Sequence, residues 1–232
     1  MRLKVLGSSS SGNCYLIENE TECLVIEAGL PFMEVKKALD FNIKKIVGVI
    51  CSHVHGDHFS HMKEYEKAGI TSVCFGKSIP EWNDEQFKHY SLRIGKFIIK
   101  PFPLVHDVPN YGFFISHPDI GKLVYITDTE YVKYRFSGLN HMIVEANYSK
   151  DAIDLDLPNA DHVLQGHFSL ENAIDFIKAN DNAALRNVIL CHLSEKNANE
   201  DVFLERTKEI TSKDVYIAKS GLEVDLSLCP FM

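Results

Sequence analysis

The sequence has no long apolar run and no excess of positive charge, and each absence narrows the possible functions. No stretch of roughly 18 consecutive apolar residues is present, so we expect no transmembrane helix and no membrane partner. The first six residues are too few, and Gly7 interrupts them too soon, for a secretory signal, so we expect a cytoplasmic protein. The formal net charge of −8 argues against broad electrostatic binding to nucleic acid.

Paired cysteine motifs are also absent. The six cysteines include no Cys-x-x-Cys pair, and most of them stand in or beside apolar runs, so we interpret them as buried, reduced thiols. With 232 residues, 45% hydrophobic and 24% charged, the chain is long enough for a domain with a sizeable core. Because we find no repeat and no convincing linker, we predict a single domain over residues 1–232.

Short runs rich in β-branched residues alternate with a few amphipathic segments. A helix is predicted to begin near Pro31, since proline in a first helical turn lacks only an N–H that would have no partner. A second is predicted over residues 170–179, with Ser169 as its N-cap and with Ala173 and Ile177 on one face. Strand-dominated halves flanked by helices favour two mixed sheets packed face to face with helices outside. Further helices are expected over 61–67 and 199–210, strands over 2–6, 15–18, 22–26, 46–50, 71–75, 97–100, 111–116, 122–126, 141–145, 188–191 and 215–218, and segment 80–96 stays unassigned.

The most informative stretch is residues 51–58, Cys-Ser-His-Val-His-Gly-Asp-His, directly after the apolar run 46–50. The run predicts a buried strand, and Gly56 allows the chain a tight path beyond its end. Three imidazoles and a carboxylate delivered to one point suit a divalent transition metal. The plainer alternative is a solvated loop that happens to hold histidines.

The His-x-His-x-Asp-His pattern of residues 53–58 resembles the signature of the metallo-β-lactamase-fold superfamily. The resemblance implies an α/β (α+β) fold, the four-layer αββα sandwich, with a metal site along one edge of the sheets. It also implies a more distant His, then an Asp, then a last His, each after a strand. Matching residues are His106 after residues 102–105, Asp128 after 123–127, and His192 after 188–191.

The same resemblance implies how two divalent metal ions would be held. Mostly imidazole ligation favours Zn²⁺, with Mn²⁺ as the second choice. A shared water would complete the open coordination position that a catalytic site needs. The implied ligands are His53, His55 and His106 for the first metal, Asp57, His58 and His192 for the second, and Asp128 as a bridge between them.

A further histidine precedes the predicted helix at residue 170. Residues 166–173 resemble a segment of RNase Z-type tRNA-processing enzymes, and more closely a Gly-His-x-Ser-Asn version in the YycJ/WalJ-type exonucleases. In RNase Z-type enzymes that His protonates the leaving oxygen and a Glu orients it, which implies His167 and Glu145 here. We count both, with Asp57, as catalytic candidates. The alternative is that His167 only caps local structure, and the other histidines, His61, His89, His117, His141 and His162, are expected to be ordinary surface or core residues.

Two more stretches resemble the YycJ/WalJ group, and three features depart from it. Residues 7–15 resemble its N-terminal Gly-Ser-Ser-Ser-x-Gly-Asn motif, a loop that could offer N–H groups and hydroxyls to a phosphate. Residues 192–197 resemble its His-Leu-Ser-x-x-Asn motif. Glu27 stands where the superfamily usually has Asp, so one extra methylene could shift a ligand. Tyr148 replaces a typical His, and the region 149–165 looks trimmed.

These residues predict a dinuclear metal-dependent hydrolase, foremost a phosphodiesterase or nuclease acting on DNA, RNA or another phosphodiester. A metal-bridging hydroxide would attack phosphorus in line while His167 protonates the departing oxygen. Two bound cations would supply the positive charge that the chain lacks. A thioester, lactone or β-lactam hydrolase, which needs no such proton donor, is the alternative, and a metal-stabilised binding module is a third. A diiron oxygen-reducing protein is disfavoured because His55 stands where its usual Glu would be. Exonuclease or endonuclease action and the oligomeric state stay open.

Overall fold

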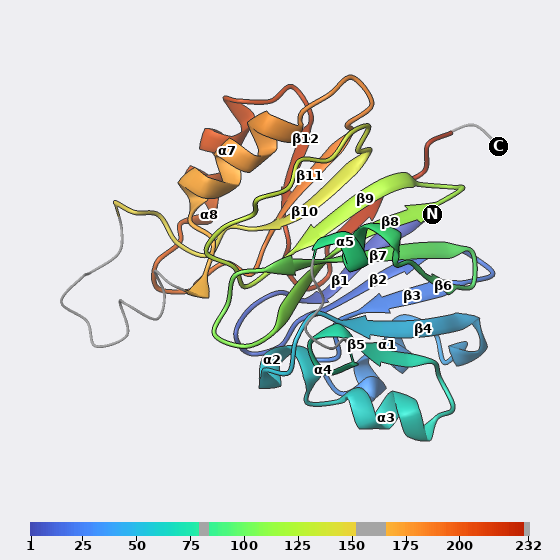
Figure 1. Ribbon diagram of the computed structural model, residues 1–232. Coiled ribbons are helices and arrows are strands. Elements are labelled where there is room, and N and C mark those ends of the chain that lie inside the picture. The colour runs from blue at the N-terminus through green and yellow to red at the C-terminus, as the bar shows by residue number, and fades with distance from the viewer. Residues whose placement is uncertain (79–83, 152–165, 230–232) are drawn as a thin grey trace.

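The computed structural model describes residues 1–78, 84–151 and 166–229, and their strands form two mixed sheets (Figure 1). The smaller sheet has the strand order β13-β1-β2-β3-β4-β5, and the larger has β12-β11-β10-β9-β8-β7-β6. The strands are β1 (Arg2–Gly7), β2 (Cys14–Glu18), β3 (Cys23–Ile26), β4 (Ile46–Cys51), β5 (Ser72–Cys74), β6 (Leu92–Ile94), β7 (Phe97–Leu104), β8 (Asn110–His117), β9 (Gly121–Ile126), β10 (His141–Glu145), β11 (Asn187–Cys191), β12 (Asp214–Ile217) and β13 (Glu223–Asp225).

Helices α1, α3, α7 and α8 lie on the outer faces of the two sheets, whereas Phe75 of α4 and Phe87 of α5 join the apolar cluster between the sheets. Figure 1 shows α7 and α8 beside β10, β11 and β12, and α1 and α3 beside β4 and β5. Among the described residues, none of these helices is both long enough and apolar enough to cross a membrane. The helices are α1 (Phe32–Ala38), the 3-10 helix η1 (Ile43–Lys45), α2 (Gly56–Phe59), α3 (Met62–Lys67), α4 (Phe75–Ser78), α5 (Asp84–His89), α7 (Leu170–Asn180) and α8 (Glu200–Lys208).

Three apolar clusters separate four layers. Alternation along β2 shows how, since Tyr15 faces the other sheet while its neighbour Leu16 faces α1 and α3. The middle cluster fills the space between the sheets, and Ile177 of α7 belongs to a further cluster that covers the outer face of the larger sheet. This arrangement confirms the expected αββα sandwich.

Most predicted elements are present, and local chemistry explains their ends. The Ser169 hydroxyl caps α7 by accepting a hydrogen bond from the N–H of Asn172 at 3.1 Å, as the sequence predicts. The Asn199 side chain caps α8 in the same way through the N–H of Val202 at 3.2 Å. Helix α1 begins directly after Pro31.

Three sequence expectations need correction. The chain does not complete its sheets with β12, because β13 follows and pairs antiparallel with β1. Strand β7 continues through Pro101 and Pro103, four residues beyond the expected end. Beyond residue 99 the outer side of β7 has no partner among the described strands, and an edge is where a strand tolerates proline. The unassigned segment contributes α5 and the short strand β6. Most of the region 149–165, which looked trimmed in the sequence, lies outside the described residues. His162 lies outside them as well.

Parallel strands determine where the chain delivers its polar residues. Strands β9, β10, β11 and β12 are mutually parallel, and β3 is parallel to β4. The carboxyl ends of parallel strands meet at one edge of a sheet, which is where α/β proteins usually place a site. His106 follows β7, which is paired antiparallel with β8, whereas the other predicted ligands and the predicted His167 partner follow or end these parallel strands, so the fold can gather them.

Candidate metal centre

Three imidazoles form one half of the centre. His53, His55 and His106 each offer a ring nitrogen, and these nitrogens lie within 4.8 Å of one another. The His106 Nε2 and His55 Nδ1 atoms are 3.2 Å apart. The Ser52 hydroxyl lies 2.9 Å from His53 Nδ1, which leaves His53 Nε2 buried without a hydrogen-bond partner among the described residues. A cation is the partner that such a nitrogen suits.

A carboxylate and two further imidazoles form the other half. Asp57, His58 and His192 offer ligand atoms within the same 4.8 Å limit. The Asp57 Oδ2 atom is 3.2 Å from His58 Nε2 and 3.3 Å from His192 Nε2. Both imidazole rings are buried, and they come from α2 and from the end of β11.

Asp128 lies between the two halves. Its Oδ2 atom is 2.9 Å from His58 Nε2, and its Oδ1 atom is 3.4 Å from His192 Nδ1. Asp128 also forms a possible ligand group with His53 and His58. The Thr127 hydroxyl donates to Oδ2 at 2.7 Å, which helps to fix the carboxylate. The structure thus brings all the predicted ligands together, although their role as ligands stays a prediction.

The backbone is strained at this centre. Among the described non-glycine residues with a left-handed backbone are Glu27, Asp128 and His192, with φ of 66°, 50° and 53°. Each follows the end of a strand by one or two residues. A left-handed non-glycine residue costs about 1–3 kcal/mol and persists where the surroundings impose it, often at functional sites.

The electrostatics depend on imidazoles rather than on lysine or arginine. Among the described residues, no lysine or arginine pairs with Asp57, Asp128 or Glu145. Burial alone would raise the pKa of the Asp128 carboxyl, but His192 and His58 hold that pKa well below its usual range. Burial and the neighbouring His58 lower the pKa of His53 to about 2, so His53 is neutral, as a ligand must be.

The predicted proton donor contacts its predicted partner. His167 Nδ1 lies 2.8 Å from Glu145 Oε1. Burial lowers the pKa of His167, but the Glu145 and Asp128 carboxylates outweigh it and raise that pKa to about 10. The Glu145 Oε1 atom is also 3.0 Å from His192 Nδ1, so one carboxylate orients two imidazoles. The N–H groups of Thr129 and Phe168 donate to Oε2 at 3.2 and 3.1 Å and hold Glu145 in place.

Asn13 is a contact that the sequence analysis missed. Its Nδ2 donates to Asp57 Oδ2 at 3.2 Å and lies 3.1 Å from His58 Nε2, while its backbone N–H donates to the Asp57 carbonyl at 2.7 Å. Gly29 permits this close packing, because a Cβ there would lie 1.7 Å from the Asp57 carbonyl oxygen. The available signal was the Gly-Ser-Ser-Ser-Ser-Gly-Asn loop, for which we had expected phosphate contacts.

Asp107 was also missed. Its Oδ1 atom lies 3.1 Å from His106 Nε2 and 3.5 Å from His55 Nε2. The side chain is about half exposed, at 49%. A carboxylate adjacent to a predicted ligand was the only available signal, and it does not reveal which way the side chain turns.

Glu27 and Tyr148, the two residues that depart from the family pattern, occupy defined positions. The Glu27 carboxylate accepts from the N–H of Ser52 at 3.2 Å and lies 3.5 Å from His58 Nδ1, so its extra methylene reaches the residue before His53. Tyr148 is buried, and its carbonyl accepts from the N–H of Leu170 at the start of α7. Tyr148 therefore supports the helix that follows His167.

The remaining described histidines lie outside the cluster. His61 lies 2.7 Å from Glu64, and His117 lies 3.2 Å from Glu22. His141 is buried beside Asn187 at the start of β11. His89 is exposed at the end of α5.

An αββα sandwich with this imidazole and carboxylate cluster at the ends of its strands defines a metallo-β-lactamase type of protein. The family model described as "Metallo-beta-lactamase superfamily" matches residues 9–132, and the chain belongs to that superfamily. Members of the superfamily generally bind divalent metals, which agrees with the donor groups found here.

Curated relatives and solved structures agree with this assignment. The chain is 25% identical to "Exodeoxyribonuclease YycJ" of Bacillus anthracis over 66% of this chain, and it spans 65% of that relative's length. It is 23% identical to "Exodeoxyribonuclease WalJ" of Streptococcus pneumoniae over 98% of this chain and 93% of the relative. The metallo-β-lactamase fold protein YhfI of Bacillus subtilis superposes with a TM-score of 0.72 at 20% identity, covering 96% and 98% of the two chains. The predicted superfamily is confirmed. The two relatives agree with the predicted exonuclease-like branch, while the activity of this chain and the bond that it cleaves are matters of proposal.

Proposed function

We propose that this protein is a dinuclear metal-dependent phosphodiesterase, foremost a nuclease, formed by one domain over residues 1–232. The observation that carries the proposal is the contact of His167 with Glu145 beside a cluster of imidazoles and carboxylates. Hydrolysis of a phosphodiester needs a proton for the departing alkoxide, and a carboxylate-oriented imidazole can supply it. The predicted cytoplasmic location is kept as part of this proposal.

The cluster fits two divalent cations, with Zn²⁺ preferred and Mn²⁺ as the alternative. When bound, such a pair would activate a shared water and neutralise charge on the phosphoryl group. His53, His55 and His106 would hold one cation, and the other would lie against the second group. That second group is Asp57, His58 and His192, and Asp128 would contribute to both sites.

The chain's own residues would position the substrate and move the proton. Glu145 accepts from His167 Nδ1, which orients the ring beside the candidate centre. The His167 side chain is 15% exposed, so part of the ring reaches the surface of the centre. The Glu145 and Asp128 carboxylates raise the pKa of His167 to about 10 in the metal-free protein, and a protonated ring is the form that a general acid needs.

The names of the relatives support a nucleic-acid substrate. Both curated relatives described above are named as exodeoxyribonucleases. DNA is therefore the first substrate to test, with RNA and small phosphodiesters beside it. Two bound cations would attract phosphate groups to a chain whose own net charge is −8.

The test is a substrate panel on protein loaded with Zn²⁺ or with Mn²⁺. We expect hydrolysis of bis-p-nitrophenyl phosphate and of labelled DNA or RNA, and its loss in Asp57→Ala. The panel should include a thioester and a lactone, since these represent the alternative hydrolase class. Turnover of a thioester or lactone without any phosphodiester cleavage in the metal-loaded protein would reject the proposal.

A further inference from the structure

A short segment beyond β9 presents aromatic and basic side chains to the surface. In residues 131–135, Tyr-Val-Lys-Tyr-Arg, the side chains of Tyr131, Lys133 and Arg135 are exposed. Val132 between them is buried against the apolar cluster beneath α7. Exposed and less exposed side chains thus alternate along the segment. We call residues 131–135 the aromatic–basic strip.

A groove separates the strip from α7. Its volume is about 250 Å³, and α7 contributes Asn172, Asp175 and Phe176 to its wall. Phe168, which also lines the groove, directly follows His167. The groove therefore runs along α7 from Asn172 to Asn180, and its lining includes the residue that follows the candidate proton donor.

Hydrogen bonds hold both ends of the strip against α7. The Asn172 side chain donates to the carbonyl of Glu130 at 3.1 Å, just before the strip. The Asn180 side chain accepts from the N–H of Phe136 at 2.7 Å, just after it. Both ends of the strip are therefore fixed to α7, and the groove does not depend on a loose surface loop.

Tyr131 is the most distinctive residue of the strip. Its side chain is 60% exposed, although its carbonyl is fixed by the Thr129 hydroxyl at 2.9 Å. The Thr129 N–H in turn donates to Glu145, so the backbone below the ring is connected to the candidate centre. An exposed aromatic ring on a fixed backbone provides a surface on which a base can stack at little entropic cost.

The charges of the strip are unusual for this chain. Lys133 and Arg135 lie together on one groove wall, whereas the whole chain carries a net charge of −8. The groove lining includes one acidic side chain, Asp175 of α7. In the part of the chain that the structure describes, no carboxylate forms an ion pair with Arg135. Basic side chains beside an aromatic ring are typical of surfaces that bind single-stranded nucleic acid.

We propose that the aromatic–basic strip binds the single-stranded part of a nucleic-acid substrate next to the candidate metal centre. One base stacks on Tyr131, and a neighbouring phosphate contacts Arg135. A duplex keeps its bases paired and stacked on one another, so it cannot place a base on this ring without opening. This inference rests on the proposed phosphodiesterase function and names its substrate class.

The experiment compares cleavage of matched single-stranded and double-stranded oligonucleotides by the metal-loaded protein, with bis-p-nitrophenyl phosphate as the small substrate. Tyr131→Ala is expected to raise KM for the single strand by about 5- to 100-fold, whereas Tyr131→Phe, which keeps the ring, stays near wild type. Arg135→Gln is expected to raise KM and to lower the slope of log affinity against log salt by about 0.7. Arg93→Gln and Phe41→Ala are matched controls, because both side chains are exposed and lie on other elements. Thermal unfolding of each variant checks its fold.

The possible outcomes distinguish failure of this inference from failure of the proposed phosphodiesterase function. If the wild type cleaves single strands while Tyr131→Ala and Arg135→Gln behave like their controls, the strip is not the binding surface. Equal KM effects on duplex and single strand would also overturn it, as would cleavage of bis-p-nitrophenyl phosphate without cleavage of any oligonucleotide. No cleavage of any phosphodiester by the wild type would overturn the proposed function itself. A selective KM increase for the single strand supports the inference.

Discussion

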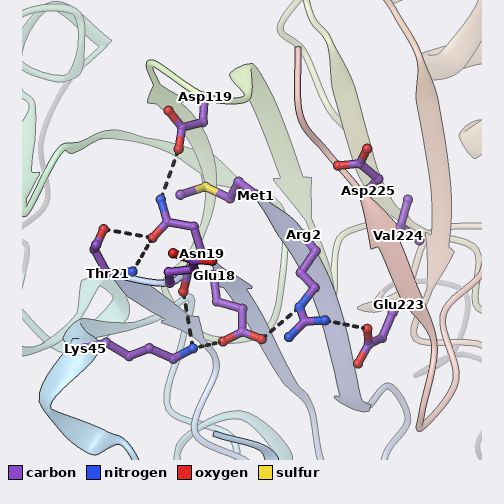
Figure 2. A pocket seen from close by; sticks show the side chains of 11 residues that line it. Met1, Arg2, Glu18, Asn19, Thr21, Lys45, Asp119, Glu223, Val224 and Asp225 are labelled. Atoms are coloured by element: carbon purple, nitrogen blue, oxygen red, sulfur yellow. Dashed lines mark hydrogen bonds and ion pairs between the residues drawn. The ribbon is translucent and has the colours of Figure 1, made fainter. Parts of the chain in front are cut away.

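Two regions of the molecule bury carboxylates, and they neutralise them in different ways. A hollow of about 760 Å³ lies beside β1, β2 and β13, and Glu18 lies at its floor with only 1% of its side chain exposed (Figure 2). Arg2 approaches Glu18 at 3.1 Å and Lys4 at 3.0 Å, and Lys45 also contacts it. At the candidate metal centre, by contrast, the ion-pair partners of Asp128 among the described residues are all imidazoles.

The difference lies in what each set of partners can release. Lysine and arginine stay protonated at neutral pH, so the Glu18 network is complete without any added ion. An imidazole can give up its proton and offer a lone pair instead, so the same nitrogens that face Asp128 can turn to a cation. Buried acids surrounded by fixed cations are therefore evidence of a structural ion pair, and buried acids surrounded by imidazoles are evidence of a metal centre.

The largest expected effect comes from removing the bridging acid. Asp128→Asn keeps the side-chain shape but removes the negative charge between the two halves of the centre. We expect bound metal to fall from two ions to one or none, and phosphodiester hydrolysis to fall to background. Metal content by mass spectrometry and a hydrolysis assay check this.

Glu18→Gln is the matched control in the hollow. It also removes a buried carboxylate, and we expect it to keep the full metal content. Equal loss of metal from both variants would break the distinction between the two regions, because it would mean that any buried acid supports metal binding through general stability.

The next effect concerns the proton donor. His167→Ala is expected to slow cleavage of an unactivated phosphodiester by about 10²- to 10⁴-fold, because the departing alkoxide then lacks a proton. For bis-p-nitrophenyl phosphate we expect a much smaller effect, since p-nitrophenolate leaves as a stable anion. Steady-state kinetics on both substrates check this, with His61→Ala as the control because His61 pairs with Glu64 outside the cluster. Similar losses on both substrates would show that His167 is not a proton donor.

Asn13 allows a closer comparison of the two regions. Its side chain donates to Asp57 at the centre, just as the Asn19 side chain donates to Asp119 in the hollow, at 3.2 and 3.0 Å. We expect Asn13→Ala to weaken binding of the second metal by about 10- to 100-fold, because it removes a donor that orients a ligand. Asn19→Ala should leave metal affinity unchanged. Isothermal titration of the metal-free protein measures both affinities. Equal metal affinities in the two variants would show that Asn13 does not support metal binding.

The sequence predicted the candidate ligands better than the side chains that hold them in position. The resemblance of residues 53–58 to the superfamily signature implied a later His, Asp and His after strands, so His106, Asp128 and His192 could be located in the sequence, and the structure brings them into one cluster. The N-cap of α7 was accessible because Ser169 directly precedes an amphipathic run.

Supporting contacts depend on side-chain direction, which local patterns do not carry. Asn13 meets Asp57 only because its loop, Gly29 and α2 pack together across the fold. The β7 prolines misled because proline usually ends a strand, and only the finished sheet shows that they lie on an edge. Strand β13 is three residues long, too short for its alternation to be distinguished from a loop.

The smallest effect tests the hollow itself. Glu18→Gln should lower the free energy of unfolding at pH 7 by about 1–3 kcal/mol, because three cations lose a buried charged acceptor. Burial raises the pKa of the Glu18 carboxyl, but the hydrogen bonds from Lys45 and Lys4 outweigh it and set the pKa below its usual range. A carboxyl whose pKa is lowered on folding stabilises the protein above the unfolded-state pKa of about 4.3, and this contribution is lost as the pH falls through the folded value. Urea unfolding at pH 7 and at pH 3 should therefore show a difference between wild type and Glu18→Gln that shrinks in acid. Glu20→Gln, an exposed neighbour, should change little at either pH. A difference that persists undiminished at pH 3 would mean that Glu18 acts through packing and not through its charge.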